Sequence, residues 1–130
     1  SVKDLRVPDN RGLPAVKGLS LEVRVGEILG IAAIEGNGQS ELLEAITGMR
    51  PYAGSITIGG KDIRGMTPGE IRKLGLSHVP EDRLATGIDK ESDISHNLLV
   101  GKHKNPEFTK FGFHQNRTAI REYAEKLFEH

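Results

Sequence analysis

The strongest constraint on the fold of this chain is an apolar run that passes through a glycine-rich turn into a helix. Residues 28–34 form a continuous apolar run, which is typical of a strand buried on both faces of a sheet. The turn that follows holds Gly36 and Gly38. Residues 40–48 place Leu42, Leu43 and Ile46 on one face of a short helix. A buried strand, a glycine turn and a helix in this order indicate an α/β chain.

The turn matches a phosphate-binding loop at all but two of its defining positions. In the pattern G-x-x-x-x-G-K-[ST], backbone N–H groups surround a phosphate at the start of a helix. Here Ala33 takes the first glycine position, Gly38 the second, Gln39 the lysine position and Ser40 the hydroxyl position. A unit charge at 4 Å contributes about 4 kcal/mol at an effective dielectric constant near 20, and Gln39 cannot replace it. The scaffold of a nucleotide site is therefore present without its positive charge.

The local residues leave two interpretations of this loop open. Gly36 and Gly38 permit positive φ and close approach of the backbone, and Ser40 is placed to bind Mg²⁺, which favours a nucleotide. Glu35 and Glu41 favour a turn without a ligand, because a carboxylate at a helix N-terminus already uses the dipole that a phosphate needs.

The rest of the chain predicts short strands and helices joined by turns. We expect an antiparallel part and the start of a parallel core, with an edge strand first and a Gly59-Gly60 hairpin late in the antiparallel part. Thr67-Pro68 predicts the start of a helix. The predicted strands are 2–7, 19–25 and 55–58 in the antiparallel part and 28–34 and 74–79 in the parallel core; the predicted helices are 40–48, 67–73 and 94–100.

The last third of the chain combines an irregular polar stretch with the clearest helical pattern. Residues 80–95 are polar and irregular, and Phe108, Phe111 and Phe113 are expected to pack in a core rather than contact a partner. One apolar helix stripe then continues to the end of the chain without a stop signal, so we expect the domain to continue beyond His130. Its members are Ile120, Tyr123, Ala124, Leu127 and Phe128.

Composition narrows the class of protein. Lysine and arginine total 18, as do aspartate and glutamate, so the charge gives no reason to expect a nucleic-acid partner. The absence of cysteine excludes disulfides and thiolate metal sites, and the spacing of the five histidines gives no metal pair. No apolar run is long enough for a membrane span, and residues 1–10 lack the apolar core of a signal peptide. We expect a cytoplasmic α/β domain.

The order of these segments resembles the first half of an ABC-transporter ATP-binding domain. The resemblance extends over residues 15–31, the loop, 42–48, 54–63 and 71–83. Residues 80–83, Pro-Glu-Asp-Arg, resemble the second of two ATP-binding domains in importer subunits for simple sugars and nucleosides, where the loop lysine is often replaced. Residues 36–42 are more similar to the nucleoside type. The resemblance implies a P-loop NTPase fold, of which residues 1–130 form a partial domain.

The chain departs from the family pattern at four points. It has no Leu-Ser-Gly-Gly signature, no strand ending in Asp-Glu and no switch histidine after such a strand. In the family these three features lie downstream. Residues 8–14 also offer no aromatic side chain on which an adenine base would stack.

The resemblance implies ATP and Mg²⁺ as cofactors and no catalytic residue in this chain. Mg²⁺ is expected at Ser40, with Glu81 at the position where most ABC domains carry the Q-loop glutamine. We expect the chain alone not to hydrolyse ATP, with hydrolysis at a partner site. The residues expected to hold the nucleotide are Gly36, Asn37, Gly38, Gln39, Ser40 and Glu41.

The resemblance also implies partners. These are a second ATP-binding domain, a transmembrane permease and, indirectly, a substrate-binding protein, with this domain on the inner face of the membrane. Residues 82–97 then have two interpretations, a hinge that leads to the permease contact or an ordinary solvated loop. The alternative function is an interaction module that binds no nucleotide and docks a partner ATPase domain or the permease. A stand-alone metabolic kinase is disfavoured, because the lysine is missing and no catalytic acid is placed.

Overall fold

The computed structural model describes residues 1–34, 36–111 and 114–128. The chain divides into two compact units, Ser1–His78 and Val79–His130. Each unit has its own apolar core.

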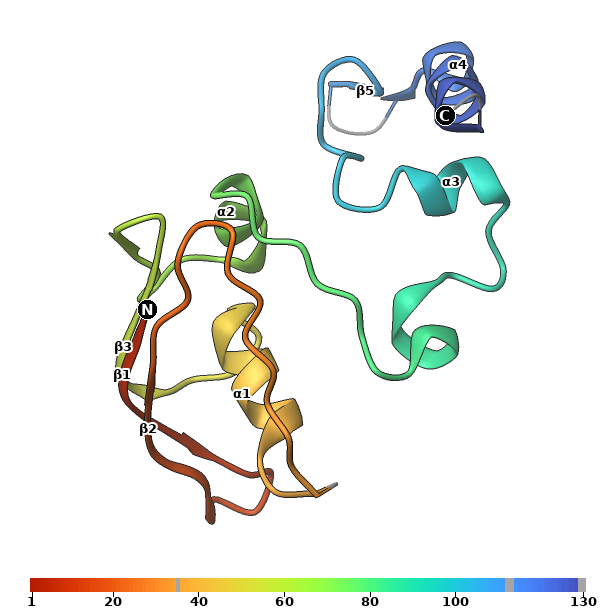
Figure 1. The fold of residues 1–130 in the computed structure, drawn as a ribbon. Helices are drawn as coiled ribbons and strands as arrows, with labels where there is room; N and C mark the ends of the chain where they lie inside the picture. The colour runs from red at the N-terminus through yellow and green to blue at the C-terminus, as the bar shows by residue number, and fades with distance from the viewer. Residues whose placement is uncertain (35, 112–113, 129–130) are drawn as a thin grey trace. The chain divides into compact units, whose positions relative to one another are not determined.

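The first unit is built on a four-stranded antiparallel sheet in the order β2-β1-β3-β4 (Figure 1). Its strands are β1 (Val2–Pro8), β2 (Pro14–Leu21), β3 (Ala53–Ile58) and β4 (Lys61–Asp62). The predicted antiparallel part and the glycine hairpin between β3 and β4 are confirmed. The expectation that the first strand is an edge strand is wrong, because β1 pairs with β2 on one side and β3 on the other.

The second strand lies earlier in the chain than predicted. The pattern placed it at 19–25, whereas β2 ends at Leu21. Leu21 pairs with Val2, which is the first residue of β1, so the residues after Leu21 have no β1 strand residue to pair with. The alternating apolar residues beyond that point, Val23 and Val25, are exposed.

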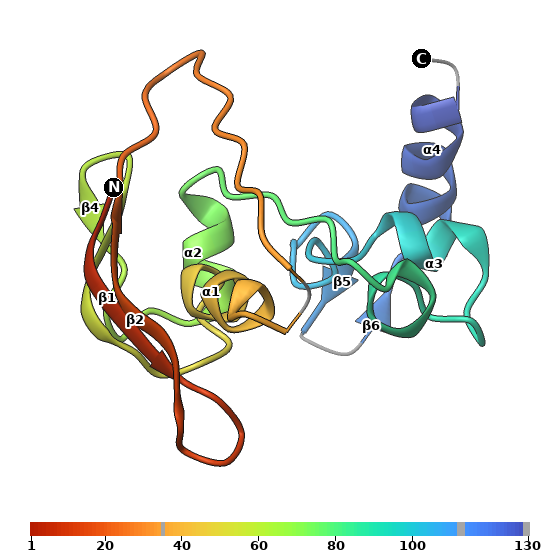
Figure 2. The same ribbon diagram turned by 60° about the horizontal axis from the view of Figure 1, so that its bottom comes forward.

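Two helices complete the first unit. Helix α1 (Gln39–Ile46) lies beside the sheet (Figure 2). It buries Leu42 and Ala45 in the core that also contains Leu5 and Ile56 of the sheet. Helix α2 (Pro68–Lys73) begins at the predicted position, where the Thr67 side chain accepts a hydrogen bond from Glu70 N–H and Glu70 caps the Thr67 backbone in return. This reciprocal capping fixes the first turn of a helix only six residues long.

The two segments predicted to start a parallel core are not strands in this structure. Residues 28–34 and 74–79 carry no sheet pairing. Ile28 is 97% exposed and Ile34 is 80% exposed. The physical reason is that a buried parallel strand needs neighbours for its backbone groups on both sides, and the described strands supply none to either segment.

The second unit is a small cluster of short elements around Leu99, Phe108 and Ile120. Phe108 packs on Tyr123 with ring centroids 5.1 Å apart, which confirms the core role predicted for Phe108. Phe111, in contrast, is 89% exposed, and Phe113 lies outside the described residues. The elements are η1 (Arg83–Gly87), α3 (Ile94–Leu98), β5 (Thr109–Lys110), β6 (His114–Gln115) and α4 (Arg117–Phe128).

Helix α4 is the predicted C-terminal helix, although only part of its apolar stripe is covered. Ile120 and Ala124 are buried, while Leu127 and Phe128 are exposed. Among the described residues, the core of this unit includes Ala119, Ile120 and Tyr123 of α4 and neither Leu127 nor Phe128. Among the helices that the structure describes, none is long and apolar enough to cross a membrane.

Candidate functional site

The loop before α1 is held against β2 by a glycine in a left-handed conformation. Gly38 caps the helix with φ 96° and is buried. A Cβ added to Gly38 would lie 2.8 Å from the carbonyl oxygen of Ala15 in β2. Both the backbone angle and the space therefore require glycine at this position. Gly36 also has positive φ (83°) but faces open space, so only the conformation restricts it.

The predicted nucleotide-binding residues lie at the start of this helix and in the turn before it. Leu42 N–H donates to the Gly38 carbonyl at 2.9 Å, which is the first hydrogen bond of the helical ladder. The N–H groups of Gln39, Ser40 and Glu41 therefore have no partner within α1. Ser40 is exposed, and Gln39 and Glu41 are half-buried. Helical N–H groups at such a position are the kind of group that binds a phosphate, and the binding of nucleotide by these residues stays a prediction.

The Gln39 side chain folds back onto the loop. Its Oε1 accepts a hydrogen bond from Asn37 N–H at 2.9 Å, and its Nε2 donates to the Ile34 carbonyl at 2.7 Å. Asn37 Nδ2 donates to the same carbonyl at 3.0 Å. The residue at the lysine position thus bonds with the loop backbone itself. Sequence reasoning identified the missing charge at Gln39 and missed this closure, because a glutamine's partners depend on the local backbone path.

Two acidic residues that the sequence associates with this loop, Glu35 and Glu81, have no described position relative to it. Glu35 lies outside the described residues. Glu81 is exposed and belongs to the second unit, whereas Ser40 belongs to the first. The joint binding of Mg²⁺ by Ser40 and Glu81 stays a prediction. Among the described residues no group of three His, Cys, Asp or Glu side chains could hold a metal ion.

The turn between β1 and β2 carries polar contacts in place of an aromatic side chain. Asp9 accepts hydrogen bonds from Leu13 N–H and Arg11 N–H, both at 2.8 Å, and the bond from Leu13 contributes most to lowering the pKa of Asp9. Arg50 donates to the Pro8 carbonyl at 3.0 Å and to Asn10 Oδ1 at 2.7 Å. Arg50 thereby ties this turn to the end of α1, a link that the sequence pattern did not reveal.

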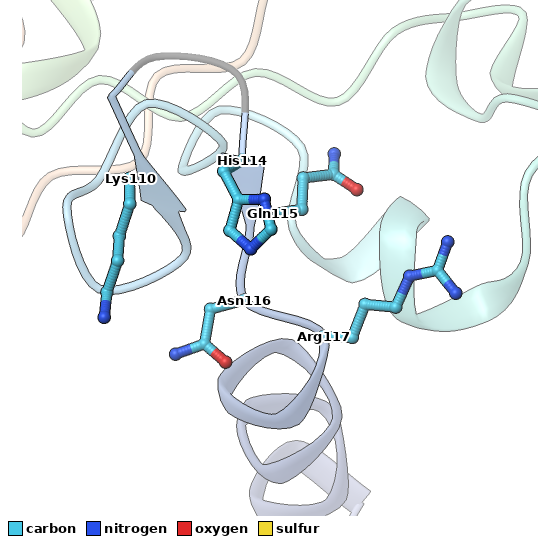
Figure 3. A pocket seen from close by; sticks show the side chains of 5 residues that line it. All are labelled: Lys110, His114, Gln115, Asn116 and Arg117. Carbon is cyan, nitrogen blue, oxygen red and sulfur yellow. The ribbon is translucent and has the colours of Figure 1, made fainter.

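A basic hollow of about 670 Å³ lies in the second unit, lined by Lys110, His114, Gln115, Asn116 and Arg117 (Figure 3). In Figure 3 the side chains of Lys110, His114 and Asn116 lie on one side, and Arg117 points away on the other. Elsewhere in this unit, Lys102 is exposed, and its Nζ lies 2.6 Å from the Tyr123 hydroxyl and 4.5 Å from its ring centroid.

His96 joins α3 to β6 within the second unit. Its Nδ1 lies 2.8 Å from Asp93 Oδ1, and its Nε2 lies 3.3 Å from Gln115 Oε1. The Asp93 carboxylate, then Gln115, raises the pKa of His96, against burial and Arg117, which lower it. Hydrogen bonds from His96 N–H and Ser95 lower the pKa of Asp93 to about 2. Asp93 accepts the His96 N–H at 2.8 Å, so it also caps α3.

Comparison with known proteins decides the family. The sequence profile of the ABC transporter family matches residues 16–129, which is most of the chain. This chain belongs to the ABC transporter family. Its fold is that of part of an ABC ATPase domain, a P-loop NTPase, with mixed α/β content and an antiparallel sheet. No solved structure matches it.

Three relatives carry import functions in their names. The chain is 42% identical to the nucleoside import ATP-binding protein NupA of Lactococcus lactis, over 98% of this chain and 25% of that protein. It is 38% identical to the guanosine import ATP-binding protein NupO of Bacillus subtilis, over 95% and 26%. It is 34% identical to the galactose/methyl galactoside import ATP-binding protein MglA of Treponema pallidum, over 95% and 24%. The chain spans about a quarter of the length of these relatives.

Proposed function

We propose that this chain is part of the ATP-binding component of an ABC importer for nucleosides or simple sugars. The support is the family match over residues 16–129, together with relatives named for nucleoside, guanosine and galactose import. The two relatives of highest identity given above are the nucleoside and guanosine proteins, which favours a nucleoside.

We infer that the nucleotide contacts the loop from Gly36 to Glu41, and that this site is degenerate. The observation that carries the inference is Gln39, which stands at the lysine position and bonds to Asn37 N–H and the Ile34 carbonyl. The N–H groups in the first turn of α1 and the Ser40 hydroxyl are the groups that would hold phosphate and Mg²⁺. Without a lysine, the site binds ATP more weakly and leaves the charge of the transferred phosphoryl group uncompensated.

Hydrolysis then belongs to a partner site. The chain carries no catalytic residue in this proposal, and Glu81 would orient a water molecule less well than the glutamine that most ABC domains carry at that position. A second ATP-binding domain would supply the active site, and a permease and a substrate-binding protein would complete the importer. The component would lie on the inner face of the membrane, held there by the permease. These assignments rest on the resemblance to the import proteins.

The exposed apolar run supports a second candidate, an interaction module that binds no nucleotide. Ile28, Ile31 and Ile34 are all exposed within one short segment, and a surface of this kind favours contact with another protein surface. In this candidate the loop only connects that run to α1, and Gln39 is a structural residue.

Calorimetry with Mg-ATP separates the two candidates. The full chain is titrated beside Ser40→Ala and Gln39→Lys, with circular dichroism as the check that each variant is folded. The proposal predicts weak binding by the parent, loss of binding in Ser40→Ala and tighter binding in Gln39→Lys. Absence of binding by all folded proteins would contradict the proposal and favour the interaction module.

A further inference from the structure

We infer that the Gln39 side chain is an internal competitor of the nucleotide, which closes the loop until a phosphate displaces it. The inference rests on the proposed nucleotide site and adds a regulatory device to it. Its basis is the pair of hydrogen bonds that the carboxamide makes to the Asn37 N–H and to the Ile34 carbonyl.

The Gln39 Oε1 atom takes the place that a phosphate oxygen would take on the loop backbone. Asn37 lies between the two positive-φ glycines of the turn, and its N–H donates to Oε1 at 2.9 Å. A loop of this type binds phosphate through such N–H groups. While the carboxamide holds this donor, the loop offers one N–H fewer to a ligand.

The other end of the carboxamide fixes the closed conformation. Nε2 donates to the Ile34 carbonyl at 2.7 Å, so both polar atoms of the side chain are engaged across the loop. The same carbonyl also accepts from Asn37 Nδ2 at 3.0 Å. When the Gln39 side chain moves away, the Ile34 carbonyl therefore still accepts the hydrogen bond from Asn37 Nδ2 and is not left without a donor. The closed state is thus stable but can be opened at low cost.

Competition and simple loss of charge predict different effects for the same substitution. If glutamine only lacks the lysine charge, Gln39→Ala leaves ATP affinity unchanged or lowers it, because a hydrogen-bond donor is lost. If the carboxamide competes, Gln39→Ala frees Asn37 N–H and raises the affinity. Removal of one net hydrogen bond from the closed loop corresponds to roughly a five- to tenfold tighter apparent Kd.

The first experiment measures closure without nucleotide. Solvent exchange of the Asn37 amide is followed by NMR in the full chain, in Gln39→Ala and in Gln39→Glu. Glutamate keeps an acceptor for Asn37 N–H but places a second acceptor against the Ile34 carbonyl, so it weakens the closed loop without removing the competing oxygen. Competition predicts exchange at least several times faster in Gln39→Ala than in the parent, and a rate between the two in Gln39→Glu. Equal exchange in the parent and Gln39→Ala overturns the inference.

The second experiment titrates the same three proteins with Mg-ATP. Gln39→Ala is expected to bind five- to tenfold more tightly than the parent, and Gln39→Glu more weakly, because it keeps the competitor and adds a negative charge. Parent affinity that equals or exceeds that of Gln39→Ala overturns competition. If none of the three proteins binds Mg-ATP, competition with a nucleotide is overturned. If Asn37 exchange nevertheless responds to Gln39→Ala, the closed loop exists and the proposed nucleotide site is what has failed.

Discussion

Two apolar segments of the first unit, β1 and residues 28–34, differ in how far they are buried. In β1, Leu5 is fully buried, and the strand is paired along both edges. In residues 28–34, which are more continuously apolar, Ile28 is 97% exposed and no ladder forms. Apolar character is thus not sufficient for burial. A strand is buried when neighbours satisfy its backbone groups and a helix covers its face, and β1 has both, whereas residues 28–34 pair with no described strand.

The largest effect expected from this comparison is on the free energy of unfolding. Leu5→Ala removes a fully buried side chain from the central strand and should lower it by about 2–5 kcal/mol. Ile28→Ala, at the exposed site, should change it by less than about 0.5 kcal/mol. Urea denaturation of both variants makes the measurement. A cost for Ile28→Ala as large as that for Leu5→Ala would mean that the apolar run is packed in solution.

A smaller loss in the free energy of unfolding is expected at Gly38, where the loop contacts β2. Gly38→Ala forces a side chain into a left-handed conformation and against the Ala15 carbonyl, and should cost about 1–3 kcal/mol. Gly36→Ala meets the same backbone penalty in open space, so it is the matched control and should cost less. Thermal unfolding of the pair tests the contact with β2. Equal losses would show that only φ matters at Gly38.

Capping of α2 should contribute about 1 kcal/mol to the packed unit. Thr67→Ala removes the side-chain oxygen that accepts from Glu70 N–H and breaks the reciprocal cap. Thr118→Ala, at an exposed threonine in α4, should change stability by less than about 0.5 kcal/mol. Chemical denaturation compares the two. A neutral Thr67→Ala would indicate that packing of Ile71 alone holds the helix.

The smallest effect concerns pH and the second unit, where polar contacts join α3 to β6. Because the folded-state pKa of His96 is raised, its contacts stabilise the unit below the unfolded pKa near 6.5 and are lost as pH rises through the folded pKa. Asp93 acts oppositely: its contribution is present above pH 3.8 and is lost as pH falls toward about 2.

NMR titration of the His96 ring tests this assignment directly. Asp93→Asn should lower the pKa of His96, because the carboxylate is the first cause of its upward shift. Asp89→Asn is the control, since Asp89 bonds to Ser92 and Glu91 and should leave the pKa of His96 unchanged. An unchanged pKa in Asp93→Asn would contradict the geometry of this pair.

Local signals in the sequence predicted much of the fold. Thr67 and Pro68 predicted the start of α2, the Gly59-Gly60 pair predicted the hairpin, and the spacing of Leu42 and Ile46 predicted α1. These features depend on neighbours within a few residues. The strand predictions at 28–34 and 74–79 depended on distant partners, and periodicity contains no information about whether such partners exist.

For the candidate site, the sequence predicted the position of the loop but not the contacts that its residues make. The order of Gly36, Gly38 and Ser40 located the loop, and Gln39 showed that its charge is missing. The contact of Gly38 with Ala15 was not predictable, because it depends on how the loop crosses β2. The return of Gln39 onto Asn37 was not predictable either, since several rotamers of a glutamine are open until the backbone path is known.

One NMR titration tests the central claim, that the degenerate loop is the nucleotide site. Mg-ATP is added to the ¹⁵N-labelled full chain, and amide shifts are followed at the loop and at the basic hollow of the second unit. The account predicts saturable shifts at Asn37, Ser40 and Glu41, and none at Lys110 or His114. Shifts at the hollow with an unchanged loop, or no saturable shift at either place, would contradict it.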